Sequence, residues 1–251
     1  ERGVRLFANM PTLFGLPVES LVSGHRQREE FTTTRFVTDR MGVSWEQRMR
    51  IAPDLRVSYG YTFDRNHTFD TDPDPDLPSV DDVVKVARLN AATVFDTRDD
   101  PLDTVRGLLL SSSLVYSSEA IGSGVNFVSH LAQAYYFRPW RQVVLAAAAR
   151  LGTAVALRGQ TLIPSQRFFG GGSRTVGGLP EEGLGPQDFL GPVGGGALLV
   201  LNQEVRFPLF WWFRGVGFLD AGNVFDTPSR IDLRDLVGSA GAGLRVNTPF
   251  A

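Results

Sequence analysis

The stretch Leu55-Arg-Val-Ser-Tyr-Gly-Tyr-Thr-Phe-Asp64 alternates between apolar and polar residues along its whole length. Successive side chains of a β-strand point to opposite faces, so this segment would have one hydrophobic and one polar face. Much the same alternation recurs from Met41 to Arg50 and from Ser239 to Asn247. The pattern therefore predicts β-strands that separate an apolar environment from a polar one.

Alternating segments of this kind fill most of the chain, and about eleven can be distinguished by their period of two. They lie near Val4 to Met10, Pro17 to Glu29, Phe36 to Ile51, Leu55 to Asn66, Val84 to Asp96, Gly107 to Tyr116, Val125 to Phe137, Gln142 to Val155, Ala197 to Phe207, Val216 to Phe225 and Val237 to Thr248.

Several of these segments exceed the usual length of strands in soluble domains, which is about five or six residues. A strand that crosses a bilayer at a tilt needs about nine to eleven residues, and the charges on its polar face must line a lumen. The pattern thus favours an all-β fold, an antiparallel transmembrane β-barrel or partial barrel. A soluble β-sandwich or barrel, whose strands also alternate, stays open as an alternative from the pattern alone. In the membrane barrel the lumen would hold Arg56, Arg88, Arg150, Glu204 and Arg206.

Composition removes several classes of function. The chain has 251 residues with 25 Lys+Arg and 27 Asp+Glu, a formal charge of −2, and no Cys. Without a basic stripe, binding to nucleic acid is not expected, because clustered Lys and Arg must meet the phosphates. Disulfides, thiolate nucleophiles and Cys-type zinc sites are excluded. The longest apolar run, Val143 to Ala149, is far shorter than the roughly 20 residues of a membrane-spanning helix.

No catalytic, metal or cofactor site is expected. The three histidines, His25, His67 and His130, are far apart and lack the spacing of a zinc site. The acidic run from Asp70 to Asp82 could gather oxygen ligands for calcium, but prolines interrupt it and a solvated acidic loop is the preferred interpretation. Gly170 to Gly172 is not followed by the Lys-Ser/Thr pair of a phosphate-binding loop.

The connections alternate between short and long, as in outer-membrane barrels. The turn from Met49 to Leu55 is tight, whereas the segments Asn66 to Asp82 and Gly159 to Gly196 are long. Eleven of the 27 glycines lie between Gly170 and Gly196. Ordering so many glycines is costly in entropy unless the loop must fold tightly in a narrow space. We therefore predict that residues 159–196 fold back into the lumen, with a flexible surface loop as the alternative.

Several motifs resemble the barrel domain of the BamA/TamA superfamily of outer-membrane assembly factors. They occur in the order that the family has, and the similarity is strong from Asp96 onward and weaker before it. The motifs are Asp96-Thr-Arg-Asp-Asp-Pro-Leu-Asp103, Arg167-Phe-Phe-Gly-Gly171 with Thr175-Val-Gly-Gly-Leu179, Ala197-Leu-Leu-Val-Leu-Asn-Gln-Glu-Val-Arg-Phe-Pro208, Gly217-Phe-Leu-Asp-Ala-Gly-Asn-Val-Phe225 and Gly241-Ala-Gly-Leu-Arg-Val-Asn-Thr-Pro249.

The resemblance implies that the loop enters the lumen and that its tip binds acidic residues of the next two strands. The family's tip motif is Val-Arg-Gly-Phe/Tyr, and Gly177 stands here where the family has Arg. Glu204 and Asp220 match the acidic partners, so we expect Arg174 or Arg206 to neutralise them in the confined lumen. The implied loop motif comprises Arg167, Phe168, Phe169, Gly170, Gly171, Arg174, Val176, Gly177, Gly178 and Leu179.

The resemblance also implies a non-enzymatic factor that inserts client β-barrels into the outer membrane of a Gram-negative bacterium, as in the bacterial surface antigen family. The expected partners are the lipid bilayer, client outer-membrane proteins, and periplasmic proteins or lipoproteins. Residues 1–251 would form a single barrel domain, a fragment without the periplasmic domains that receive clients. The alternatives are a two-partner-secretion pore with the Gly-rich loop as its plug, and a soluble β-domain derived from such a parent.

Overall fold

The computed structural model of the protein describes residues 2–12, 18–30, 36–70, 81–189 and 191–246. These residues are largely β-strand, as their alternation predicts. The strands are β1 (Arg2–Met10), β2 (Val18–Glu30), β3 (Phe36–Ala52), β4 (Leu55–Asp70), β5 (Asp81–Asp96), β6 (Gly107–Ser117), β7 (Phe127–Trp140), β8 (Val143–Ala156), β9 (Gln187–Asp188), β10 (Gly191–Pro192), β11 (Ala197–Phe210), β12 (Phe213–Phe225) and β13 (Val237–Val246).

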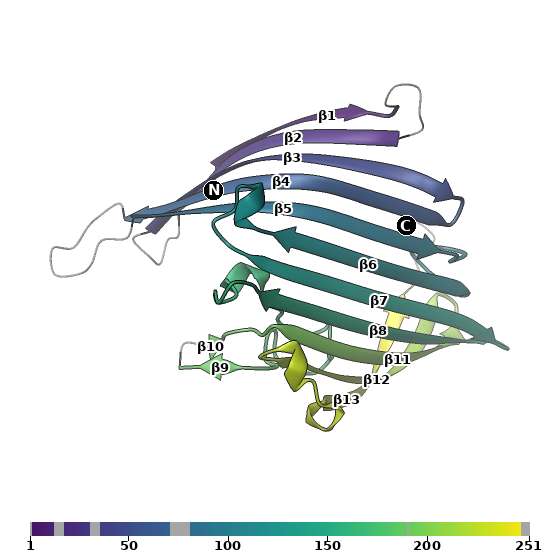
Figure 1. Cartoon of the computed structure of the whole chain (residues 1–251). Helices are drawn as coiled ribbons and strands as arrows, with labels where there is room; N and C mark the ends of the chain where they lie inside the picture. Colours follow the sequence, from purple (N-terminus) through teal and green to yellow (C-terminus); the bar gives the residue numbers. More distant parts are fainter. Residues whose placement is uncertain (1, 13–17, 31–35, 71–80, 190, 247–251) are drawn as a thin grey trace. The chain divides into compact units, whose positions relative to one another are not determined.

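One 11-stranded sheet contains all strands except β9 and β10. Its order follows the chain from β1 to β8 and then continues through β11, β12 and β13 (Figure 1). Strands β9 and β10 pair only with each other, inside the connection between β8 and β11. The eleven predicted segments match the strands of the 11-stranded sheet, and the all-β prediction is confirmed. Part of the acidic run from Asp70 to Asp82 lies outside the described residues. Thr248, the last residue of the final predicted segment, also lies outside them.

Contacts divide the chain into two compact units. The first unit comprises Glu1–Ala92, Leu114–Val128 and Leu157–Gln160, and the second comprises Thr93–Ser113, Ser129–Ala156 and Thr161–Ala251. Residues 161–196 of the Gly-rich loop and the strands β11 to β13 therefore belong to the second unit.

Each unit exposes the hydrophobic face of its strands. In the first unit Val43 is 56% exposed, and in the second Leu219 is 62% exposed. Large hydrophobic side chains that face outward over neighbouring strands require an apolar environment. The opposite, polar face of β8, β11 and β12 carries Arg150, Asn202 and Asp220, and this face is the one that positions the loop.

Several polar side chains of the first unit are paired, on both faces of the strands. On the polar face, Asp64 accepts a hydrogen bond from Arg88 and lies 3.5 Å from His25 Nε2. On the hydrophobic face, Gln47 donates to Ser20 at 3.3 Å and accepts from the hydroxyl of Tyr59. Such pairing gives these polar groups hydrogen-bond partners, which a hydrocarbon environment cannot supply.

The remaining regular structure is short. It consists of the 3-10 helices η1 (Glu119–Ile121), η2 (Pro164–Gln166), η3 (Pro228–Arg230) and η4 (Leu233–Asp235). Within the described ranges, no helix has the length and apolar character needed to span a membrane.

Candidate functional site

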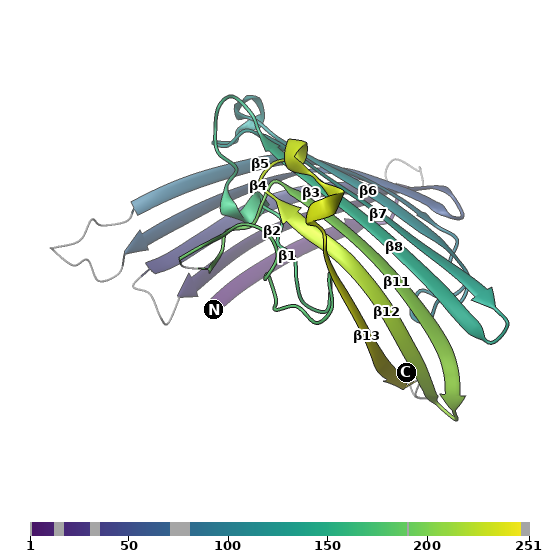
Figure 2. The ribbon, with the colours of Figure 1, turned by 90° about the horizontal axis from the view of Figure 1, so that it is seen from below.

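The base of the Gly-rich loop is fixed by Arg167 and Phe168. The Arg167 guanidinium donates to the carbonyls of Leu162 and Val193 at 3.1 and 3.2 Å. The backbone of Phe168 exchanges hydrogen bonds of 2.8 and 2.9 Å with Gly195. These contacts join the outgoing and returning arms of the loop, which Figure 2 shows folded beside the strands of the second unit.

Glycines allow the arms of the loop to approach closely. Gly171 has a φ of +117°, and a Cβ there would lie 2.3 Å from the carbonyl oxygen of Pro180. The Gly171 backbone also donates to, and accepts from, the hydroxyl of Thr175 at 2.7 Å. Gly170 pairs with Leu184 across the loop, and the phenyl ring of Phe169 packs against Gly194. The glycine content thus serves a compact loop.

A small hydrophobic core holds the loop against the sheet. Val176 and Leu184 of the loop are buried against side chains of β11 and β12, and Phe168 and Leu179 pack around them. The buried partners on the strands are Leu198, Val200 and Val224. Apolar burial on an otherwise polar face therefore gives the loop its own docking site.

The tip of the loop is bound through its backbone. Asp220 of β12 accepts a hydrogen bond of 2.9 Å from Gly177 N and a second of 2.8 Å from Asn202 Nδ2. The same Asn202 amide donates to the carbonyl of Thr175 at 2.7 Å. A Cβ on Gly177 would lie 3.2 Å from an Asp220 carboxylate oxygen, so the close approach favours glycine. We call Asp220, Asn202 and Arg150 the clamp.

Arg150 completes the clamp from β8. Its guanidinium donates to the carbonyl of Arg174 at 2.6 Å and to Asn202 Oδ1 at 2.9 Å. A guanidinium in this position therefore binds the loop and orients the amide that binds Asp220. The cation of the clamp comes from the sheet, whereas in the family motif it comes from the loop tip. The side chain of Arg174 is exposed.

Glu204 is paired within the sheet. It accepts a hydrogen bond from Arg206 on its own strand and lies 3.7 Å from Arg245 of β13. The Arg206 guanidinium also stands 5.5 Å from the ring centroid of Phe137. The structure thus brings Asp220 to the loop tip and Glu204 to two arginines, and Arg206 rather than Arg174 neutralises Glu204.

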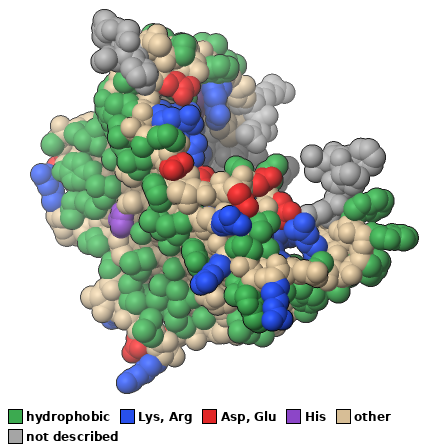
Figure 3. All heavy atoms as spheres, turned by 90° about the vertical axis from the view of Figure 1, so that its right-hand side faces the viewer, with side chains coloured by type: hydrophobic (Ala, Val, Ile, Leu, Met, Phe, Trp, Pro, Cys, Tyr) green, Lys and Arg blue, Asp and Glu red, His purple; other side chains and the backbone are tan. Residues whose placement is uncertain are grey.

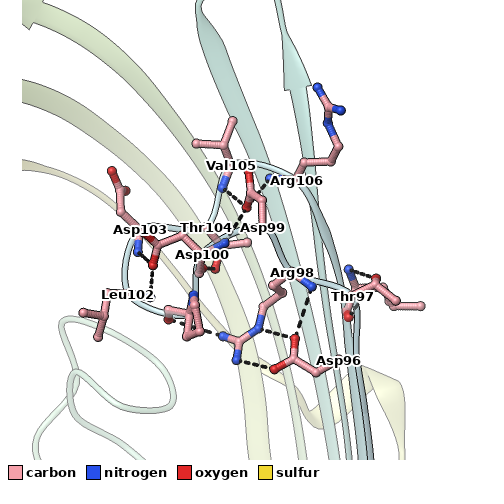
Figure 4. A network of polar contacts seen from close by, with 12 residues as sticks. Asp96, Thr97, Arg98, Asp99, Asp100, Leu102, Asp103, Thr104, Val105 and Arg106 are labelled. Atoms are coloured by element: carbon pink, nitrogen blue, oxygen red, sulfur yellow. Dashed lines mark hydrogen bonds and ion pairs between the residues drawn. The ribbon is translucent and has the colours of Figure 1, made fainter. Parts of the chain in front are cut away.

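A second ordered segment is the turn between β5 and β6 (Figure 4). Asp99 accepts hydrogen bonds from the backbone N–H groups of Arg106 and Val105 at 3.1 and 3.0 Å. These backbone donors, Arg106 first, lower the pKa of the Asp99 carboxyl, since they favour its charged form. Arg98 makes two hydrogen bonds of 2.9 Å to Asp96, and this bonding raises the pKa of Arg98.

This turn contacts β11 and β12, two of the three strands that bind the loop. Arg206 Nη1 donates to the carbonyl of Thr104 at 3.2 Å, and Arg214 Nη1 donates to Asp103 at 2.9 Å. Arg206 therefore links Glu204 to the turn, and the motif from Asp96 to Asp103 acts as a structural brace of β11 and β12.

Sequence reasoning placed Arg150 on the polar face, and the same alternation puts Asn202 on the face of Glu204 and Arg206, but neither residue was assigned to the loop. The strand register supplies the missing signal, because Val200 pairs with Arg150 and Asn202 pairs with Asp220. In the described part of the chain no group of His, Asp or Glu side chains could hold a metal ion.

The comparisons with known proteins define the class of this fold. The crystal structure of BamA from Haemophilus ducreyi lacking POTRA domains 1-3 is similar with a TM-score of 0.82 at 15% sequence identity. The match covers 98% of this chain and 56% of that chain, so this chain spans about half the length of the structure it matches. The described strands therefore form an antiparallel sheet with the fold of part of the BamA barrel. A family model described as the Omp85 superfamily domain matches residues 1–251, and the chain belongs to that superfamily.

Proposed function

We propose that the protein is a BamA/TamA-like factor that assembles client β-barrels in the outer membrane of a Gram-negative bacterium. Membership of the Omp85 superfamily and the BamA barrel fold support this role. The proposed action is non-enzymatic: a free strand edge pairs with a client strand, whose backbone groups would otherwise be unsatisfied in the bilayer.

The observation that carries the proposal is the match of residues 1–251 to the Omp85 superfamily domain, and the strand considered for client pairing is β13. Over the described residues the strand order ends at β13, which pairs with β12 from Val246↔Phe213 to Val237↔Gly222. On its hydrophobic face Leu244 is 71% exposed. In the proposal a client strand adds to the sheet at β13 and pairs with its backbone donors and acceptors.

Site-specific photo-crosslinking tests the proposal. A photoreactive residue in place of Leu244 should capture a client β-barrel during its folding into vesicles. The matched control replaces Leu201, which lies on the same hydrophobic face of the internal strand β11 and is 38% exposed. Equal capture at both positions, or no acceleration of client folding by the protein, would overturn the proposal.

A two-partner-secretion type of pore, with the Gly-rich loop as plug, is the second candidate. The clamp favours it, because hydrogen bonds fix the loop tip to the polar face of β8, β11 and β12. Conductance across a planar bilayer distinguishes the two functions. In a plugged pore the Asp220→Ala variant should pass more current, whereas in an assembly factor it should change client folding at unchanged conductance.

The loop motif from Arg167 to Leu179 and its partners Glu204, Arg206 and Asp220 have a positioning role in this proposal. The 159–196 segment would fill part of the lumen and stiffen the wall beside the free edge. Lipoproteins and periplasmic proteins are further proposed partners.

A further inference from the structure

The hydrophobic face of the second unit contains a groove over β5 to β8. Its volume is about 460 Å³. Leu110 and Leu151, which are 41% and 39% exposed, stand on that face. Small side chains between larger ones leave room for a narrow apolar chain. The residues that form it include Phe95, Leu110, Leu151, Ala132, Ala134 and Ala149.

Basic and aromatic side chains continue this face along β7. Positions spaced by two share a face of a strand, so Tyr136, Arg138 and Trp140 follow Ala132 and Ala134. All three side chains are exposed. Arg138 lies four residues beyond Ala134, which is about 14 Å along a strand. That distance is close to half of a hydrocarbon core roughly 30 Å thick, so a groove within the core would place Arg138 near the headgroups.

The end of the β7–β8 hairpin has a positive charge without compensation. Residues 127–156 contain no Asp or Glu. Within the described part of the chain, Arg138 and Arg141 have no carboxylate partner, and the Arg141 guanidinium stands 5.7 Å from the ring centroid of Trp140.

The acidic residues of the β5–β6 turn are already engaged. Asp96 binds Arg98, and Asp103 binds Arg214. Asp99 and Asp100 accept backbone N–H groups of their own turn. Figure 3, which looks at the side of the molecule where β7 ends, shows Lys and Arg side chains, several of them next to Asp or Glu side chains, set among hydrophobic ones.

Two strained turns present bulky residues at this end of the strands. Arg141 and Trp211 have φ values of +57° and +49°. Gly, Asn or Asp adopt such backbone conformations at lower cost, and a bulky residue there is unusual. Trp211 is 89% exposed. Three of the four tryptophans lie in these two turns or beside them, at positions 140, 211 and 212, and tryptophan is typical of the membrane interface.

We propose that the outer face of β5 to β8 binds an anionic phospholipid. An acyl chain occupies the groove, and the headgroup phosphate binds the guanidinium groups of Arg138 and Arg141. A guanidinium matches the geometry of a phosphate and keeps its charge at the interface. This inference rests on the proposed membrane location and specifies which lipid the barrel selects.

The test measures energy transfer from tryptophan to dansyl-labelled lipid in the full chain folded into phosphatidylcholine vesicles. Labelled phosphatidylglycerol should bind in preference to labelled phosphatidylcholine. The double variant Arg138→Gln/Arg141→Gln should lower that preference by about tenfold or more. The matched control is Arg234→Gln, because Arg234 is an exposed arginine on η4.

A second variant tests the groove separately from the charge. Ala134→Phe should weaken binding of the lipid while leaving binding of inorganic phosphate unchanged, since only the lipid has an acyl chain. Equal energy transfer from the wild type to both labelled lipids, or an unchanged preference in the double variant, would overturn the inference. Heat-modifiable gel mobility shows separately whether the wild type folds into the vesicles. A wild type that does not fold would overturn the proposed membrane function as well, whereas a folded wild type without lipid preference would overturn only the lipid site.

Discussion

Replacing Asp220 by alanine should release the tip of the Gly-rich loop. The carboxylate accepts two hydrogen bonds, from Gly177 N and from Asn202 Nδ2. A hydrogen bond to a charged group contributes about 1.5–3 kcal/mol, and only the bond from Gly177 joins the loop to the sheet, so its loss should cost roughly 2 kcal/mol of loop docking. The hydrophobic core around Val176 is unaffected by the change, so the strands should stay paired.

Amide hydrogen exchange gives the magnitude directly. A cost of roughly 2 kcal/mol raises the open population of the loop about thirtyfold, because about 1.36 kcal/mol corresponds to a factor of ten. Mass spectrometry of the folded protein should show this loss of protection in peptides that cover residues 171–185. Peptides from β8 should keep their protection.

The control variant is Glu182→Gln, which removes a carboxylate of the same loop that is exposed to solvent. Its exchange should equal that of the wild type. If Asp220→Ala leaves the exchange of residues 171–185 within a factor of about two of the wild type, the clamp contributes less than the 1 kcal/mol typical of a single neutral hydrogen bond and the reasoning is refuted.

Three further predictions concern packing, pH and the brace. Gly152→Ala should lower the free energy of unfolding by about 1–3 kcal/mol in denaturant titrations, because the new Cβ would lie 2.6 Å from the ring of Phe168. The control Gly217→Ala should be neutral, because a Cβ there would have no atom within 4 Å. The pKa of the Asp99 carboxyl is lowered in the folded protein, so its hydrogen bonds stabilise the turn at pH values above the unfolded pKa of about 3.9. This stabilisation is lost as the pH falls through the lower folded pKa. The Asp99→Asn variant should therefore lose less free energy of unfolding than the wild type between neutral and acidic pH. A double-mutant cycle of Asp103→Asn and Arg214→Gln should give a coupling below about 1 kcal/mol, since both side chains are about one-third exposed, and a much larger coupling would contradict this view of the brace.

The strands could be predicted from the sequence because one face of each had to be apolar. The alternation from Leu55 to Asp64 identifies β4 directly, and the tight turn before it is confirmed by the pairing of Ala52 with Leu55. The ends of the strands were harder to predict from the sequence. Beyond Asn66 the residues of β4 no longer alternate clearly, so the predicted segment stops before the observed end at Asp70.

The site was predictable only in part, because it depends on which strands are neighbours. Alternation places Asn202 and Arg150 on the polar face, but local sequence does not show that both reach one loop segment. Likewise, nothing in the period of two shows that Thr104 lies beside Arg206, since the hydrogen bond between them joins residues 102 positions apart. The resemblance implied an arginine at the loop tip, where Gly177 stands, whereas the hydrogen bond from Arg150 of the sheet to the loop required the structure.

The clamp also depends on correct strand pairing. Arg150, Asn202 and Asp220 lie on three different strands, and a slip of one residue between partners would turn a side chain to the opposite face. A misregistered strand would then present Leu201 or Leu219 to the loop, and neither side chain could replace the lost hydrogen bonds. Docking of residues 174–177 therefore requires the native register of β8, β11 and β12. A docked loop accordingly indicates that these three strands are correctly paired.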